Sequence, residues 1–121
     1  MSEKKTLVVG ASQNPARYAY KAIHKLRYFN HPVVALGKKE GLVDNVKIET
    51  GNPLFTNIDT ISIYLNKENQ KPIENYLLSL NPKRIIFNPG AENNGLKAIA
   101  EKKGIETMEA CTLVMLTIGA F

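Results

Sequence analysis

The sequence predicts an α/β protein, doubly wound, with a mostly parallel five-stranded sheet and helices on both faces. Short apolar runs rich in β-branched residues alternate along the chain with segments of helical spacing. This alternation is typical of parallel strands joined by crossover helices. The length of 121 residues fits one domain, over residues 1–121. Among the layouts that right-handed crossovers allow, we expect a Rossmann-like sheet of order 3-2-1-4-5.

The first strand is expected at residues 6–9, ending at Gly10. A helix should follow, with Asn14 as its N-cap and Pro15 in its first turn. Apolar residues then recur at helical spacing on one side of this helix. His31-Pro32 should end the helix near Asn30, because proline disfavours helical conformation in the residue before it.

The other main strands are predicted at residues 33–36, 59–65, 84–87 and 105–109, with a possible short edge strand at 46–48. Helical spacing returns near residues 73–80 and 94–103, and a closing apolar helical turn is expected at 111–118. The sequence shows no internal repeat and no linker.

The net charge of +5 favours anionic partners in general. The basic residues are scattered, however, and no aromatic-basic RNA motif is present, so nucleic acid is not expected. No run of about 18 apolar residues predicts a membrane span. The first residues lack the pattern of a leader, and the single cysteine favours a cytoplasmic protein. Two histidines and this cysteine have no metal-like spacing, so no metal site is expected.

Four polar or glycine-containing turns follow the predicted strands. They lie at residues 10–15, 37–39, 64–66 and 88–90. In an open parallel sheet, ligands bind beyond the carboxyl ends of the strands, where the strand order reverses. We therefore expect all four turns to face one crevice.

The first turn has the chemistry of a phosphate site. Gly10 allows a tight bend and leaves room for a phosphate close to the backbone. The free N–H groups and the dipole of the following helix favour an anion. Ser12 and Asn14 add polar side chains, and Arg17 is placed to reach a pyrophosphate.

The turn is not the G-x-G-x-x-G of dinucleotide enzymes and has no Walker lysine. Dinucleotide enzymes carry an acid after the second strand, where this chain has Gly37 followed by Lys38 and Lys39. These lysines favour an additional phosphate. Two ligands carry one there, coenzyme A with its 3′-phosphate and NADP with its 2′-phosphate.

Several segments together resemble the small stand-alone CoA-binding domains, relatives of the nucleotide-binding domain of the succinyl-CoA synthetase α subunit. They are residues 8–12, 14–18, 31–33, 59–64 and 88–93, so the resemblance covers nearly the whole chain. It implies a Rossmann-like fold that binds coenzyme A, with pyrophosphate contacts at Gly10, Ala11, Ser12 and Arg17. Lys38 would lie near the adenosine phosphate, and Asn66, Asn88, Pro89 and Gly90 would line the rest of the crevice, with Tyr18 beside it. Many such relatives carry serine where this chain has Ala19.

No catalytic residue is assigned from the sequence. His24, His31 and Cys111 are each expected to be packing or surface residues rather than a general base or a nucleophile. The leading hypothesis is a non-catalytic module for coenzyme A or an acyl-CoA, and the alternative is an NADP-binding oxidoreductase-type domain or subunit. A homodimer, or an acyl-CoA enzyme as partner, is also plausible, since the apolar segment 113–121 offers a contact surface.

Overall fold

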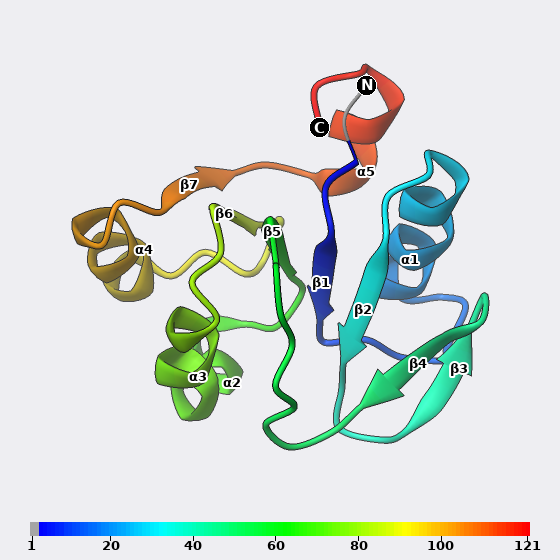
Figure 1. Cartoon of the computed structure of the whole chain (residues 1–121), viewed down its shortest axis with the longest axis horizontal. Coiled ribbons are helices and arrows are strands. Elements are labelled where there is room, and N and C mark those ends of the chain that lie inside the picture. The colour runs from blue at the N-terminus through cyan, green and yellow to red at the C-terminus, as the bar shows by residue number, and fades with distance from the viewer. Residues whose placement is uncertain (1–2) are drawn as a thin grey trace.

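A computed structural model describes residues 3–121, which form one sheet with helices on both faces (Figure 1). The sheet has seven strands in the order β3-β4-β2-β1-β5-β6-β7. Every neighbouring pair is parallel except β3 and β4. The strands are β1 (Thr6–Val9), β2 (Val33–Leu36), β3 (Gly41–Val43), β4 (Val46–Glu49), β5 (Thr60–Ile63), β6 (Arg84–Phe87) and β7 (Glu106–Glu109). The predicted α/β class with a mostly parallel sheet is confirmed.

The helices divide between the two faces of the sheet. One face carries α1 (Tyr18–Tyr28) and α5 (Thr112–Thr117). The other carries α2 (Lys67–Gln70), the 3₁₀ turn η1 (Lys71–Ile73), α3 (Glu74–Ser79) and α4 (Asn94–Lys102). No helix within residues 3–121 has the length and apolar character needed to cross a membrane.

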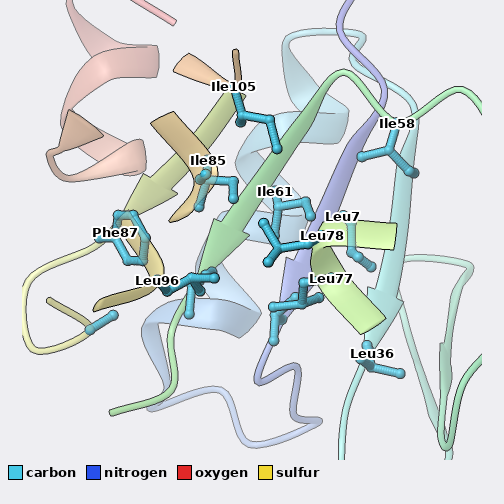
Figure 2. Packing of buried hydrophobic residues seen from close by; sticks show 14 residues of the cluster. Leu7, Leu36, Ile58, Ile61, Leu77, Leu78, Ile85, Phe87, Leu96 and Ile105 are labelled. Atoms are coloured by element: carbon cyan, nitrogen blue, oxygen red, sulfur yellow. The ribbon is translucent and has the colours of Figure 1, made fainter. Parts of the chain in front are cut away.

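Alternating side chains of the central strands supply both halves of the core. In β1, Leu7 and Val9 point to the α3 and α4 face, whereas Val8 points to the α1 and α5 face. Figure 2 shows the first cluster, in which Leu77 and Leu78 of α3 pack on Leu7 and Ile61. Strands β1, β5 and β6 are buried along their whole length. This packing holds the carboxyl ends of the three strands in fixed positions relative to one another.

The predicted strand number and order need correction. The third main strand, β5, pairs with β1 in the register Val9↔Ile63 instead of lying beyond β2. The place beside β2 is taken by β4, paired through Leu36↔Glu49. The five main strands therefore run 2-1-3-4-5. The segment after β2 forms β3 and β4, and β4 occupies the edge beside β2.

This segment is a β-hairpin that the sequence analysis missed in part. Residues 46–48 were expected as a possible edge strand, and they do form a strand, but β3 covers its outer side. The hairpin turn is Asp44-Asn45, with φ of +49° and +64°. Two consecutive positive φ values are characteristic of a type I′ turn, which suits asparagine and aspartate.

Two predicted helices have different bounds in the structure. The first begins at Tyr18 instead of near Pro15. The second, expected near 73–80, is three consecutive pieces between Lys67 and Ser79. Pro72 lies in the middle piece, where a proline cannot donate to the helical ladder.

Candidate functional site

A groove of about 1140 Å³ crosses the carboxyl ends of β1, β2 and β5 and reaches the turn after β6. The ends of β1 and β2 lie on the lower side of the sheet in Figure 1. The groove spans the point between β1 and β5 where the chain changes direction across the sheet, and ligands of open α/β sheets bind there. Most of the residues predicted for the site line it: Gly10, Ala11, Ser12, Asn14, Arg17, Tyr18, Gly37, Lys38, Asn66, Pro89 and Gly90.

A smaller hollow of about 530 Å³ lies at the opposite, amino-terminal side of the strands. Lys5, Asp59 and Lys83 line it, and Lys5 already donates from Nζ to the Thr56 carbonyl at 2.8 Å. We place the site in the larger groove, because the strand ends there carry unpaired backbone and helix-start groups.

Gly10 has a φ of +91°, in the left-handed region that favours glycine, and it lies at the bend after β1. Its N–H and that of Ala11 both donate to the Leu36 carbonyl at 3.0 Å. These two amides are therefore already bonded inside the protein. Gly10 and Ala11 offer a ligand a close backbone approach rather than free donors.

The free donors of the first turn lie one step further on. Within residues 3–121, the backbone N–H groups of Ser12 and Gln13 donate to no protein acceptor. The Ser12 Oγ accepts the Asn14 N–H at 3.0 Å, which leaves the hydroxyl hydrogen free to point into the groove. The turn after β1 thus presents two amides and one hydroxyl to an anion.

Asn14 is not the N-cap that the sequence predicted. Its Oδ1 accepts the Ala16 N–H and its carbonyl accepts the Arg17 N–H, both at 3.0 Å, which closes a separate turn before α1. Arg17 is the N-cap, and its side chain makes no capping hydrogen bond. In the described chain, the N–H groups of residues 18–20 therefore have no protein acceptor at the start of α1. Because α1 begins at Tyr18 and not near Pro15, the free amides lie at Tyr18 and Ala19, which line the groove.

Lys38 and Lys39 extend from the exposed loop between β2 and β3. In the part of the chain that the structure describes, neither ammonium forms an ion pair. Glu40 of the same loop also lines the groove, a position that the sequence analysis did not weigh. The loop therefore brings two cations and one carboxylate to this end of the groove.

The other end of the groove lies between the turns after β5 and β6. Asn66 caps α2, accepting the Asn69 N–H at 2.9 Å, and both residues line the groove. Leu65 and Ile73 add apolar surface there. Gly90, with φ of +93°, completes the wall on the β6 side.

Asn88 was predicted to line this crevice, but it does not. It is 2% exposed, and its Nδ2 donates to Ser62 Oγ at 2.9 Å and to the Ile63 carbonyl at 3.0 Å. Its Oδ1 accepts the Thr112 N–H at 2.8 Å. Asn88 thus fastens the start of α5 to the ends of β5 and β6, beneath the groove.

A second buried amide, Gln70, holds the two far turns together and was missed by the sequence analysis. Its Nε2 donates to the Leu65 carbonyl at 2.8 Å and to the Ala91 carbonyl at 2.7 Å. Its Oε1 accepts from Asn93 Nδ2 at 2.9 Å. In the sequence Gln70 stands in a polar stretch typical of a surface, so no pattern marks it as buried.

Neither of the two histidines nor Cys111 lines the groove. His31 is 3% exposed and lies with Lys4 at the amino ends of the strands, and His24 faces Asp44, with 3.7 Å between Nδ1 and Oδ2. Cys111 is half-buried at the start of α5 and is not among the lining residues. Tyr64 does line the groove, and burial raises the pKa of its hydroxyl.

The fold is a doubly wound α/β architecture, with a groove that crosses the carboxyl ends of its strands and the start of α1. The family model for the CoA binding domain matches residues 4–117, so this chain belongs to that family. Among curated proteins, no sequence matches the chain at a significant level.

Solved structures share the fold. The crystal structure of an uncharacterized protein is 44% identical, covers 100% of both chains and superposes with a TM-score of 0.97. A hypothetical protein from Pyrococcus horikoshii OT3 is 18% identical, with a TM-score of 0.82 over 92% of this chain and 80% of its own. A protein from Thermus thermophilus, cell-free ID.343, is also 18% identical, with a TM-score of 0.82 over 98% and 91%. The last two likenesses concern the fold alone.

Proposed function

We propose that the chain binds coenzyme A or an acyl-CoA in the groove and acts as a binding module without a reaction of its own. The observation that carries this proposal is the continuity of one groove from Lys38 through the first turn to Gly90. A long ligand with a charged head and a thin, uncharged arm suits such a shape. Membership of the CoA binding domain family supports the choice of ligand.

The pyrophosphate is assigned to the first turn and the start of α1. The free amides of Ser12 and Gln13 and the Ser12 hydroxyl are donors there. The α1 N-terminus adds its dipole, and Arg17 adds an exposed guanidinium at the groove. Gly10 and Ala11 contribute the close approach, since their own amides are engaged by Leu36.

The two ends of the ligand are assigned from the charge and polarity of the walls. Lys38 is proposed to bind the 3′-phosphate of the adenosine, because its ammonium is exposed and unpaired in the described chain. Tyr18, 66% exposed, lines the same groove and offers an aromatic face to the ligand. The pantetheine arm then runs between Asn66 and the Pro89-Gly90 turn, over Leu65 and Ile73.

Calorimetric titration with coenzyme A, dephospho-coenzyme A and NADP tests the proposal. We expect coenzyme A to bind most tightly, and Lys38→Ala to bring its affinity down to that of dephospho-coenzyme A. Absence of binding to either CoA form would overturn the proposed function. Equal affinity of the wild type for both would remove the role of Lys38 while leaving the groove as a CoA site.

The alternative is an NADP-binding domain of the oxidoreductase type. Glu40 favours it, because a carboxylate near the end of β2 is an acceptor for ribose hydroxyls. In this reading Lys38 or Lys39 binds the 2′-phosphate. If NADP competes with coenzyme A for the groove at comparable concentration, the alternative gains; if it fails to compete, the alternative falls.

The proposed partners are a second copy of the chain or an acyl-CoA enzyme. Val114 and Ile118 of the α5 segment are 54% and 69% exposed, and they are the apolar surface on which this proposal rests. Light scattering at working concentration measures the oligomeric state, and a monomer would count against self-association.

A further inference from the structure

The loop that carries Lys38, Lys39 and Glu40 touches the first turn at both of its ends. At the β2 end stands Gly37, and at the β3 end stands Gly41. A Cβ on Gly37 would lie 2.5 Å from the Ala11 carbonyl oxygen. A Cβ on Gly41 would lie 2.4 Å from Cδ of Gln13. At Gly37 the close atom belongs to the backbone of Ala11, whereas at Gly41 the Gln13 side chain would have to move to admit a Cβ.

Gln13 makes the second of these attachments. Its Oε1 accepts the Leu42 N–H at 3.0 Å, across 29 positions of the sequence, while its side chain lies along the backbone of Gly41. No other side-chain hydrogen bond between the first turn and residues 38–43 is found in the described chain. The side-chain amide of Gln13 therefore links the first turn, proposed to bind the pyrophosphate, to the Lys38–Glu40 loop, proposed to bind the ribose phosphate.

The side chains of Lys38 and Lys39 are not held by a comparable interaction in the described chain. Lys38 and Lys39 are exposed, and in residues 3–121 neither forms an ion pair. Their positions follow from the backbone between Gly37 and Gly41. The Gly37 end is held independently, because its N–H donates to the Glu49 carbonyl at 2.9 Å. The Gly41 end depends on the β3–β4 ladder and on Gln13.

We propose that Gln13 is a positioning residue, which holds the Lys38–Glu40 loop at a fixed separation from the first turn and so sets the preference for a nucleotide with a phosphate on its ribose. The inference rests on the proposed function, since it assigns the ribose phosphate to this loop. Gln13 acts through Lys38 by holding β3, and its side chain is not itself assigned a bond to the phosphate.

The test compares the affinities of coenzyme A and dephospho-coenzyme A in Gln13→Ala, Gln13→Met and the wild type. Methionine keeps most of the bulk of glutamine but lacks its strong acceptor. We expect both variants to lose about fivefold of the preference for coenzyme A, as for a weakened exposed ion pair. A purely structural defect would weaken both ligands alike and leave the ratio unchanged.

A double-mutant cycle with Lys38→Ala shows whether the two residues act together. In the Lys38→Ala background, Gln13→Ala should change the ratio no further. Asn75→Ala is the control, because Asn75 is an exposed side-chain amide in α3 and lies outside the groove. Its ratio should stay at the wild-type value.

Amide hydrogen exchange gives a readout that needs no ligand. The Leu42 N–H should exchange faster in both Gln13 variants, while the Gly37 N–H stays protected by Glu49. If the wild type prefers coenzyme A and both variants keep that preference, the inference is overturned and the proposed function stands. If the wild type binds neither CoA form, or binds both equally, the inference falls with the assignment on which it rests.

Discussion

The backbone of Gly37 lies against the carbonyl oxygen of Ala11, so closely that a Cβ on Gly37 would stand 2.5 Å from it. The same Cβ would lie 2.9 Å from Cγ2 of Ile48. Two turns of the groove thus meet at a point where only a hydrogen fits. The requirement for glycine here comes from close approach of the backbones.

We therefore expect Gly37→Ala to force the two turns apart. Overpacking of this kind costs about 1–3 kcal/mol in the free energy of unfolding. Affinity for coenzyme A should fall as well, because Gly37 and Ala11 both line the groove. Urea unfolding and calorimetry measure the two effects.

Gly95→Ala is the matched control for this substitution. Gly95 lies in α4, and the nearest atom to its added Cβ is Asn93 Oδ1 at 3.6 Å, an ordinary contact. Alanine should stabilise the helix slightly, by about 0.5–1 kcal/mol. Unchanged stability and affinity in Gly37→Ala would contradict the conclusion that the space between Gly37 and Ala11 admits no Cβ.

Asn88 and Asn69 should respond to alanine in opposite ways. Asn88→Ala removes the acceptor of the buried Thr112 N–H, which costs about 1–3 kcal/mol of stability. Asn69 is exposed in the groove, so Asn69→Ala should weaken coenzyme A binding with little change in unfolding. Loss of binding in Asn88→Ala without loss of stability would support the ligand contact that the sequence analysis assigned to Asn88.

The sequence predicted the strands well because the central ones are short, apolar and bounded by turn residues. It missed β3 because Gly41-Leu42-Val43 is too short to show a period. The order 3-2-1-4-5 was wrong for the same reason. If residues 41–49 are interpreted as mostly loop, the sequence pattern does not show that β4 already occupies the edge beside β2.

The candidate site was predicted from turns that follow strands. The structure brings these turns to one groove, because parallel strands end on one side of the sheet. Whether a backbone N–H of a turn is free to bind a ligand depends on its hydrogen bonds to distant segments of the chain, and the sequence does not show these. The Gly10 and Ala11 amides are taken by Leu36, and the Gln13 side chain is directed to Leu42. Asn88 was assigned to the crevice because a buried asparagine and a ligand-binding one look alike in a sequence.

Phe121 should be a core residue rather than part of a contact surface. It is 7% exposed, its ring lies 4.5 Å from Cζ of Arg84, and its centroid is 4.9 Å from that of His31. Phe121→Ala is expected to cost about 3–5 kcal/mol of stability. Phe121→Leu should cost less, because leucine keeps most of the apolar bulk. The cost that remains includes the loss of the cation–π contact with Arg84.

Thermal or urea unfolding of both Phe121 variants provides the measurement. Ile118→Ala is the control, because Ile118 is 69% exposed in the same segment and should have a small effect. If Ile118→Ala destabilised the protein as much as Phe121→Ala, α5 would be covered in solution, as a subunit contact would require.

The protonation of His31 should make the protein less stable as the pH falls below about 6.5. His31 is 3% exposed, and its Nδ1 accepts the Lys4 N–H at 3.0 Å, which requires that nitrogen to be unprotonated. Burial lowers the pKa of His31, and the cations Lys4 and Arg84 lower it further, against the opposing effects of Glu3 and Asp59. The unfolded chain therefore takes up a proton more readily than the folded one.

Because the folded-state pKa lies below the ordinary value, stability is fully present above about pH 6.5 and declines as the pH falls toward the folded-state value. Between the two values, one such group contributes a slope of at most about 1.4 kcal/mol per pH unit. His31→Asn should remove this contribution, and His24→Asn, at a position 45% exposed beside Asp44, is the matched control. Urea unfolding between pH 5 and 8 gives the three slopes. A slope that survives in His31→Asn and disappears in His24→Asn would assign the proton to the helix α1 surface instead of the buried site.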